Sequence, residues 1–362
     1  MPDSVGLPGG KMTDVRMLLV GLGNLGRRFC EIVADREGLL AERYGLRLVL
    51  VGAVDSRGAA YDPSGLDFRA VARLKRSGGT IGDYPGVGRR GWEAVEFVET
   101  CEADLLLEAS PVNLDRGAEP ALSCIRLAMQ KGMHVVTPNK GPLVVAFRAL
   151  HELARIRGVS LRYDGTVAGG APAINLGCRD LRGARVRLIE GVPNLTTGFV
   201  MDLLADGLPW DAAVQMAREA GVLEGDGAWD LEGWDAAAKL VILSNAVMGV
   251  DAKIDDVVRA GVASVSVAEL MAAKARGERY RVLARAELGP DGGWSLSALP
   301  TALRPDHPLG RLGSKQMGVV YTTDIYGEIT LIIEEREPIP SAATMLRDLL
   351  DIYVDDRTTL VV

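Results

Sequence analysis

The chain has 362 residues, of which 48 % are hydrophobic and 25 % are charged, and its formal net charge is −7. This length favours two domains sharing a cleft, and the composition is that of a folded globular protein. The negative charge argues against a surface for nucleic acid or anionic membranes, although a local pocket can still bind a small anion. No apolar run reaches the roughly 18 residues that a transmembrane helix needs.

The N-terminus and the cysteines bear on processing and location. Residues 1–12, MPDSVGLPGGKM, lack the apolar centre of a signal peptide, so we expect a disordered leader or residues upstream of a second start at Met12. The four cysteines are widely spaced without a Cys-x-x-Cys pair, and the three histidines are scattered. The sequence therefore predicts neither a disulfide framework nor a zinc site, and a cytoplasmic protein with reduced thiols is the simplest interpretation.

A glycine-rich turn follows the first apolar run. Residues 17–20 have the pattern of a buried strand, and glycines spaced G-x-G-x-x-G then lead into a helical pattern. In a dinucleotide-binding turn the first glycine allows the tight turn, the second lets the pyrophosphate approach the backbone, and the third lets helix and strand pack closely. The helix N-terminus offers its free N–H groups to the phosphates. We therefore predict a dinucleotide site at Gly21, Gly23, Asn24, Leu25 and Gly26.

The end of the second apolar run bears on which dinucleotide binds. The segment LRLVLVGAVDSRG ends in Asp55, Ser56 and Arg57. An acid at this strand end usually holds the ribose hydroxyls, whereas an arginine nearby can accept a 2′-phosphate. Both are present, so this feature leaves NAD and NADP open, and Arg57 with Lys75 further along favours NADP slightly. Each cation could equally be a solvated surface charge.

Two more strand patterns enclose an amphipathic helix. The strands are expected in ADLLLEASP, residues 103–111, and in GMHVVTPNKGPL, residues 132–143. The intervening GAEPALSCIRLAMQKG has helical apolar spacing and a closing glycine. This alternation predicts a Rossmann-type, doubly wound parallel sheet, in which ligands sit beyond the carboxyl ends of the strands. We therefore expect three strand-end residues at the cofactor crevice, namely Ser110, Asn139 and Lys140.

An acid-rich segment leads into a helix that contains one lysine. In EGDGAWDLEGWDAAAKL, residues 224–240, Asp235 and Lys239 stand four apart on one face of a strong helix former. An isolated pair of this kind is usually a surface ion pair worth only about 0.3–0.5 kcal/mol. Here Ala, Leu, Val and Ile adjoin the pair. That setting suits a lysine that an aspartate orients and keeps protonated, ready to hydrogen-bond a carbonyl oxygen.

These motifs occur in an order that resembles the homoserine dehydrogenases. The resemblance rests on MHVVTPNKGPL, YDGTVAGGAPAI, GVPNLTTGFVMDLL and AGVLEGDGAWDLEGWDAAAKLVIL, and most specifically on the spacing of Glu224, Asp230, Asp235 and Lys239. It continues more weakly through KQMGVVYTTDIYGEITLI. It implies an NAD(P)-dependent oxidoreductase that interconverts L-aspartate 4-semialdehyde and L-homoserine in threonine and methionine biosynthesis, in the short form without a C-terminal regulatory domain.

The resemblance also implies roles for individual residues. It places Lys239 at the reacting oxygen, with Asp235 holding it and Lys140 reaching the same substrate. Acids would hold the α-ammonium group of the amino-acid substrate. The substrate-binding residues that it implies are Glu224, Asp230 and Thr166.

The glycine-rich stretch DGTVAGGAPAI is expected to cross between the domains. In the family, backbone carbonyls here can hold a monovalent cation such as Na⁺, which would map to Val167, Gly169 and Ala171. A hinge or tight turn that needs a flexible backbone explains the glycines equally well.

Two segments depart from the family pattern. The usual N-G-T-x-N is NLTTG here, from Asn194 to Gly198, and the glycine-rich GPGAG element before the last helix is replaced within residues 334–340. These changes leave open another NAD(P)-dependent dehydrogenase of amino-acid metabolism that acts on a related aldehyde or alcohol. A non-catalytic dinucleotide-sensing protein is the alternative from another class, but it would not need to retain Lys140, Asp235 and Lys239.

The expected organisation has two domains and a returning tail. Strands are expected in RVRLIEGVP, RYRVLARAEL and GWSLSAL, a hairpin in VVYTTDIYGEITLII and a helix in SAATMLRDLLDIY. Because the family dimerises through the sheet of its catalytic domain, we expect a homodimer. The expected parts are a leader over 1–12, an NAD(P)-binding Rossmann domain over 13–143, an α+β catalytic and dimerisation domain over 144–317, and a C-terminal segment over 318–362 that returns to the nucleotide-binding domain.

Overall fold

The structure, a computed structural model, describes residues 12–223, 227–335 and 339–354. The chain divides into two units. Unit 1 contains the described residues up to Gly165 and from 339 onward, and unit 2 contains those from Thr166 to Glu335. The chain thus passes from one unit to the other inside the glycine-rich stretch DGTVAGGAPAI.

The strands of unit 1 form a doubly wound sheet. They are β1 (Thr13–Val20), β2 (Leu46–Asp55), β3 (Gly58–Tyr61), β4 (Gly88–Arg90), β5 (Leu105–Glu108), β6 (His134–Val136) and β7 (Leu161–Arg162). In the described part of the chain their order is β4-β3-β2-β1-β5-β6-β7. In this spatial order the neighbouring strands β2, β1, β5, β6 and β7 pair in parallel. Strands β3 and β4 extend the sheet beyond β2 with antiparallel pairing. The predicted parallel sheet is confirmed.

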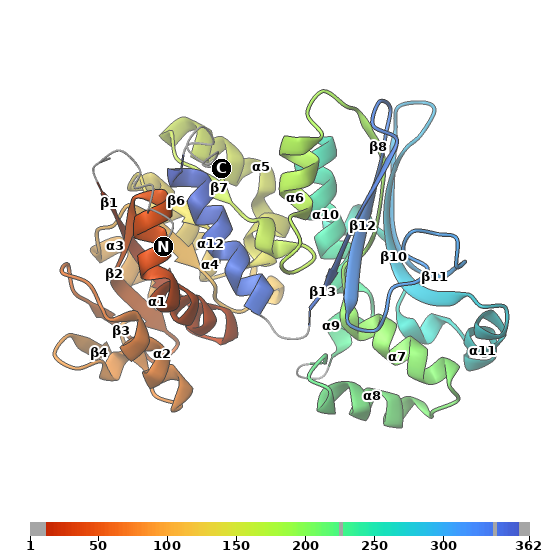
Figure 1. Cartoon of the computed structure of the whole chain (residues 1–362), viewed down its shortest axis with the longest axis horizontal. Helices are drawn as coiled ribbons and strands as arrows, with labels where there is room; N and C mark the ends of the chain where they lie inside the picture. The colour runs from red at the N-terminus through yellow and green to blue at the C-terminus, as the bar shows by residue number, and fades with distance from the viewer. Residues whose placement is uncertain (1–11, 224–226, 336–338, 355–362) are drawn as a thin grey trace, which may run out of the picture. The chain divides into compact units, whose positions relative to one another are not determined.

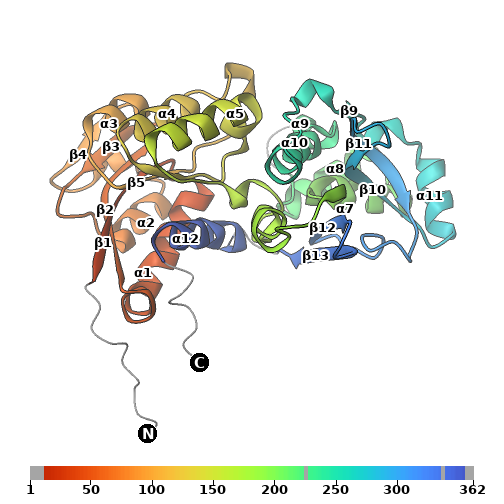
Figure 2. The same cartoon turned by 90° about the horizontal axis from the view of Figure 1, so that it is seen from above.

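Helices cover both faces of this sheet. They are α1 (Asn24–Tyr44), α2 (Phe68–Arg76), α3 (Ala94–Thr100), α4 (Ala121–Gln130), α5 (Lys140–Arg157) and α12 (Ile339–Tyr353). Figure 2 shows α1, α2 and α12 on one face and α3, α4 and α5 on the other. Apolar residues of β1, β2 and α1 form one core with Met345 and Leu349 of α12, so the last helix belongs to unit 1.

Helix α12 is tied to the end of unit 1 by buried polar groups. Asp348 is 1 % exposed and accepts a hydrogen bond from the Asp164 backbone N–H at 2.9 Å. Arg347 Nη2 donates to the Asp164 carboxylate at 2.6 Å, whereas Asp348 Oδ1 has no hydrogen-bond partner among the described residues. Burial, and then the charge of Asp164, raise the pKa of the Asp348 carboxyl to about 8. In the folded chain this carboxyl is therefore mostly protonated at neutral pH.

The contribution of Asp348 to the unfolding free energy should consequently fall as the pH rises through the neutral range. The folded-state pKa of Asp348 lies above its ordinary value of 3.8, so its stabilising contribution is complete below that value and is lost as the pH approaches 8. Asp348→Asn should flatten this dependence in melting curves recorded between about pH 5 and pH 8.5. The matched control is Glu152→Gln, which removes an acid from the exposed side of α5 and should leave the dependence intact. If the stabilities of wild type and Asp348→Asn change with pH in parallel, the raised pKa of the Asp348 carboxyl is contradicted.

Unit 2 is built on a mixed sheet. Its strands are β8 (Val186–Val192), β9 (Val258–Arg259), β10 (Arg279–Leu288), β11 (Trp294–Leu303), β12 (Gln316–Thr323) and β13 (Glu328–Glu334). Among the described residues their order is β13-β12-β8-β10-β11-β9. The pairs are antiparallel except for the parallel pair of β9 and β11. The strands and the hairpin expected in this region are confirmed.

The helices of unit 2 include one that is apolar on nearly all sides. They are α6 (Ala173–Asn175), α7 (Leu195–Ala205), α8 (Trp210–Glu219), α9 (Ala228–Leu231), α10 (Trp234–Met248) and α11 (Val267–Ala275). Helix α10 packs on β8, β10 and β11 (Figure 1). Its Leu240 and Leu243 lie near Ile189 and Ala284. A helix buried in this way must pair its polar side chains, because an unpaired buried charge is costly.

Some boundaries differ from those expected from the sequence. The strand expected over 132–143 is only His134–Val136, because the Asn139 side chain caps α5 and the helix already begins at Lys140. The strand is confirmed, but its predicted end at Asn139 and Lys140 was wrong, and Lys140 is a first-turn helix residue. Unit 1 continues beyond residue 143 because β7 pairs with β6, and the β12–β13 hairpin stays in unit 2. No helix in the described ranges is long and apolar enough to cross a membrane.

Candidate functional site

The turn between β1 and α1 leaves part of its backbone open. Gly21 has a φ of +90° and lies against the backbone of Ser110, so a side chain there would clash. A side chain at Gly26 would strike the Gly21 carbonyl group, whereas a Cβ placed at Gly23 would meet nothing within 4 Å. No side chain caps α1 at Gly23. An open backbone beside the uncapped N-terminus of a 21-residue helix suits a pyrophosphate. Asn24 and Leu25 are the first residues of that helix.

Asp55 at the end of β2 is turned towards donors of its own chain. Its Oδ1 accepts the Arg57 backbone N–H at 2.9 Å and the Thr80 hydroxyl at 2.8 Å. Its Oδ2 accepts Lys75 Nζ at 2.6 Å and the Ile81 N–H at 3.0 Å. Burial acts to raise the pKa of Asp55, but these hydrogen bonds outweigh it and hold the pKa below its usual value. The carboxylate therefore braces the turn that carries Arg57 against helix α2, which carries Lys75, with its four lone-pair positions occupied.

The buried Glu108 joins the ends of β5 and β6. It was not among the predicted site residues. Glu108, the last residue of β5, is 0 % exposed. Its carboxyl accepts the Ser110 backbone N–H at 2.9 Å, the Ser110 hydroxyl, and the Thr137 hydroxyl at 3.1 Å. The Asn139 side-chain amide donates to the Ser110 hydroxyl at 3.5 Å. Ser110 and Asn139, both predicted at the cofactor crevice, are thus brought together. An acid at the end of an otherwise apolar strand, LLLE, was the available signal.

In unit 2, Asp235 and Lys239 meet in a buried polar cluster at the start of α10. Lys239 Nζ lies 2.8 Å from Asp235 Oδ2 and donates to the Pro193 carbonyl at 2.7 Å. Asp235 is 2 % exposed and the Lys239 side chain 15 %. The carboxylate sits in the first turn of α10, where the helix dipole favours a negative charge. This pair is therefore not the solvated surface pair that the spacing alone most often produces.

Asn194 links Asp235 to Asp230. Its side-chain amide donates to Asp230 Oδ1 and to Asp235 Oδ2, both at 2.7 Å. Its Oδ1 accepts the Thr197 N–H at 3.0 Å, so the same side chain is the N-cap of α7. One amide thus bridges two carboxylates and joins α7, α9 and α10 around the lysine. Asn194 was not among the predicted site residues, although an asparagine preceding a helical pattern is a typical cap signal.

Comparisons with known proteins place these motifs in one family. The family model described as homoserine dehydrogenase matches residues 172–350. A homoserine dehydrogenase of Methanocaldococcus jannaschii is 32 % identical over 338 residues, which cover 93 % of this chain and 98 % of that protein. The chain belongs to the homoserine dehydrogenase family. An NAD(+)-dependent homoserine dehydrogenase of Pseudomonas canavaninivorans is also 32 % identical, over 94 % of this chain and 97 % of that protein.

The fold agrees with a solved homoserine dehydrogenase. The crystal structure of the enzyme from Thermoplasma acidophilum matches with a TM-score of 0.81 and 26 % identity, over 93 % of this chain and 98 % of that chain. The chain is thus an NAD(P)-dependent oxidoreductase that acts on a CH–OH group, and it interconverts L-aspartate 4-semialdehyde and L-homoserine in amino-acid biosynthesis. The function expected from the resemblance is confirmed.

One departure from the family pattern has a packing explanation. A Cβ at Gly198 would lie 3.2 Å from Cδ of Arg281. Arg281 is 2 % exposed and forms two hydrogen bonds, at 2.9 and 3.0 Å, with the Asp202 carboxylate of the next turn of α7. Glycine at position 198 therefore makes room for the buried Arg281 side chain, which is paired with the partly exposed Asp202. Part of the second departure, residues 336–338, lies outside the described residues.

The remaining predicted site residues are placed as follows. Thr166 is 4 % exposed at the start of unit 2, and Ser56 follows directly after β2. Lys140 belongs to unit 1 and Lys239 to unit 2. Glu224 lies outside the described residues, so its role stays a prediction. In the described ranges, no cluster of His, Cys, Asp and Glu could hold a metal ion.

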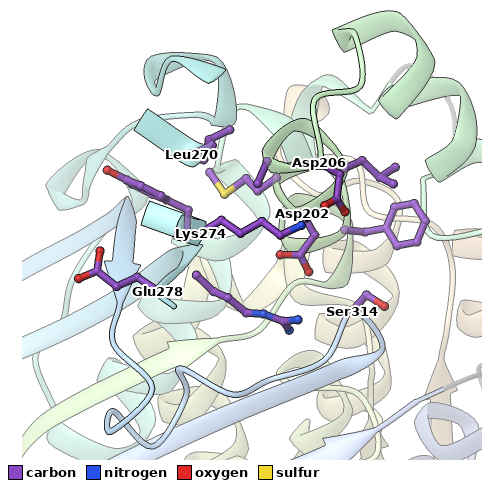
Figure 3. A pocket seen from close by; sticks show the side chains of 12 residues that line it. Asp202, Asp206, Leu270, Lys274, Glu278 and Ser314 are labelled. Atoms are coloured by element: carbon purple, nitrogen blue, oxygen red, sulfur yellow. Dashed lines mark ion pairs between the residues drawn. The ribbon is translucent and has the colours of Figure 1, made fainter. Parts of the chain in front are cut away.

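A cavity of about 270 Å³ in unit 2 lies apart from these residues. Residues of α7, α11 and β10 line it, and Figure 3 shows Lys274 reaching towards Asp206, with which it forms an ion pair. Asp202, also in the lining, is paired with Arg281. Its acids are thus engaged by neighbouring cations, and none of the predicted substrate or cofactor residues lines it. The candidate site in unit 2 is therefore the cluster of Asn194, Asp230, Asp235 and Lys239, and not this cavity.

Proposed function

We propose that Lys239 stabilises the reacting oxygen of the substrate and exchanges a proton with it. The supporting observation is the 2.8 Å contact between Lys239 Nζ and the buried Asp235 carboxylate. The bound nicotinamide supplies or accepts the hydride. Reduction of the aldehyde places negative charge on its oxygen, and an ammonium group held there stabilises that charge and donates the proton. In the reverse direction the lysine, once it has lost a proton, accepts one from the alcohol.

The acids of the cluster are proposed to bind the amino group of the substrate. Asp230 shares the Asn194 amide with Asp235, which places one carboxylate next to the other. Asp235 is engaged by Lys239, so Asp230 is the acid proposed for the α-ammonium group, together with Glu224. Thr166 is the third proposed substrate contact, and Lys140 is the proposed second catalytic lysine.

The substrate assignment is tested by oxidation of NADPH and NADH with L-aspartate 4-semialdehyde, using the whole chain. We expect turnover with this aldehyde, and weaker turnover with the amino-acid semialdehyde that is one carbon longer. Turnover with only the longer aldehyde would favour the related dehydrogenase that the two departures left open. Binding of dinucleotide without turnover of either aldehyde would favour the sensor.

We infer a preference for NADP from the surroundings of Asp55. Its oxygens are occupied by donors of the chain, so this acid is poorly available to ribose hydroxyls. The exposed Arg57 guanidinium stands beside it, with Nη2 donating to the carbonyls of Gly78 and Gly79 at 2.9 and 2.8 Å. Arg57 thus offers a 2′-phosphate one positive charge, whereas Lys75 of α2, which contacts the same Gly79 carbonyl, is already paired with Asp55.

Arg57→Ala should weaken NADPH binding far more than NADH binding. Loss of a hydrogen bond between charged groups costs about 1.5–3 kcal/mol, so we expect roughly a 10-fold to 100-fold rise in Kd for NADPH. The Kd values of both cofactors, measured by calorimetry, check this. The control is Arg47→Ala, which removes an arginine of β2 that is paired with Asp14. Equal losses for NADPH and NADH in Arg57→Ala would show that this residue does not recognise the phosphate.

We also propose that Na⁺ binds to the backbone carbonyls of Val167, Gly169 and Ala171. Ala168 and Gly169 have left-handed φ values of 54° and 58°, and the Glu335 carboxylate lies against Gly169. Carbonyl and carboxylate oxygens are the ligands that hard cations prefer, which supports this proposal. The ion would fix the segment at the start of unit 2.

We propose a homodimer in the cytoplasm. Strand β13 is at the edge of the second sheet, and its Ile332 is 47 % exposed. An exposed apolar edge strand favours pairing with another copy. All four cysteines are free thiols, as expected in a reducing compartment.

A further inference from the structure

Glu108 is a carboxyl group in a place where such a group is costly. It is 0 % exposed and follows three buried leucines in β5. Burial raises the pKa of its carboxyl, and the hydrogen bonds from Ser110 and Thr137 act against that shift. Removing a carboxyl group from water costs several kcal/mol unless hydrogen bonds replace the lost hydration. The hydrogen bonds to the Glu108 carboxyl therefore indicate its function.

The groups that contact the Glu108 carboxyl act as donors and lie at the carboxyl edge of the sheet. One oxygen accepts the Ser110 N–H and hydroxyl, and the other accepts the Thr137 hydroxyl. The Thr137 oxygen in turn accepts the Asn139 backbone N–H at 3.0 Å. Asn139 Oδ1 accepts the Gly141 N–H, also at 3.0 Å, and so caps α5. A continuous chain of hydrogen bonds thus runs from Glu108 to the first turn of α5.

We propose that Glu108 is a positioning residue for the reaction, which fixes Ser110 and Asn139 and, through the Asn139 cap, the backbone that carries Lys140. Because it is fully buried, it acts through these residues and not by contact with substrate. The inference rests on the proposed function, which places Ser110 and Asn139 at the cofactor and makes Lys140 catalytic. This role explains the presence of a buried glutamate at the ends of the neighbouring strands β5 and β6.

Glu108→Gln perturbs the chain of hydrogen bonds with little change in volume. The amide oxygen can still accept from Ser110, but the amide nitrogen would face the Thr137 hydroxyl, which must then reverse its hydrogen bond. A misplacement of this kind should lower kcat on the order of 10-fold to 100-fold. Hydrogen exchange at the Gly141 amide should become faster. Thr137→Val removes the hydroxyl that joins Glu108 to Asn139. It should lower kcat and speed exchange at the Gly141 amide to a similar extent.

A double-mutant cycle distinguishes positioning from general destabilisation. If Glu108 acts through Thr137, the double variant Glu108→Gln/Thr137→Val should lose no more kcat than the worse single variant. The control is Phe97→Leu, a fully buried residue of unit 1 outside this network, which should lower Tm and leave kcat unchanged. If Glu108→Gln lowers Tm as Phe97→Leu does but keeps wild-type kcat and wild-type exchange at Gly141, the proposal is overturned. Additive losses in the double variant would overturn it as well.

Two further variants separate this proposal from the proposed function. If Lys140→Met and Ser110→Ala both keep full activity and cofactor affinity, the assignment of the site in unit 1 fails, and the positioning proposal fails with it. If those variants lose activity while Glu108→Gln does not, only the positioning proposal fails. Should Glu108→Gln not fold, Thr137→Val decides alone, and wild-type kcat in that variant overturns the proposal.

Discussion

Lys239→Met is expected to lower kcat by roughly 10²–10³-fold while the Kd of NADPH stays near its wild-type value, by analogy with the removal of an oxyanion donor. Methionine fills nearly the same volume against the apolar face of α10. The loss should appear in kcat more than in KM, because the lysine acts on charge that develops only during hydride transfer. Steady-state rates with L-aspartate 4-semialdehyde measure it.

Stability must be separated from catalysis in this variant. Without its lysine the Asp235 carboxylate stays buried with the Asn194 amide, so Tm is expected to fall. The double variant Asp235→Asn/Lys239→Met removes the buried charge and should regain Tm without regaining kcat. Lys274→Met is the matched control, because it removes a lysine from an exposed ion pair with Asp206 in the same unit. If the Asp235–Lys239 pair were only structural, restoring Tm would restore turnover.

Asn194→Ser is expected to lower kcat by about 10-fold to 100-fold, the equivalent of losing hydrogen bonds to charged groups worth about 1.5–3 kcal/mol. Serine still caps a helix well, so α7 keeps its N-cap. Its short side chain cannot bridge Asp230 and Asp235, which then repel each other and loosen the carboxylate that holds Lys239.

Asn194→Ala separates the two functions of this side chain. It removes both the cap and the bridge, so it should lose about 1 kcal/mol more stability than the serine variant, with a similar loss of kcat. Melting curves measured beside steady-state rates check both variants. Wild-type kcat in Asn194→Ser would show that the bridge has no catalytic importance and that Asn194 serves only as a cap.

The parts of the fold that depend on local patterns could be predicted from the sequence. The glycine turn and the apolar strands of unit 1 follow from short-range spacing, and so does the helical pair of Asp235 and Lys239. The start of α5 was missed because the residues from 134 to 136 and the segment after them were interpreted as one strand, although Asn139 is a typical capping residue.

The supporting contacts of the site could not be predicted in this way. Asn194 and Asp235 are separated by 41 residues, and Glu108 and Thr137 by 29. Such contacts depend on how strands and helices pack, which neither the 3.6-residue nor the two-residue period encodes. Most hydrogen bonds that Asp55 accepts also join residues far apart in the sequence. Only the structure shows that the Asp55 carboxylate is occupied by donors of its own chain.

The proposed role of Lys239 is tested most directly by the single-turnover rate of hydride transfer. The measurement uses NADPH with and without deuterium at the transferred position, bound to wild type and to Lys239→Met, with saturating L-aspartate 4-semialdehyde. We predict that the rate falls by roughly 10²–10³-fold in Lys239→Met and that the isotope effect on turnover rises, because loss of the oxyanion donor makes the chemical step limiting. The same hydride-transfer rate and isotope effect in both proteins would contradict the assignment of Lys239 to the reacting oxygen.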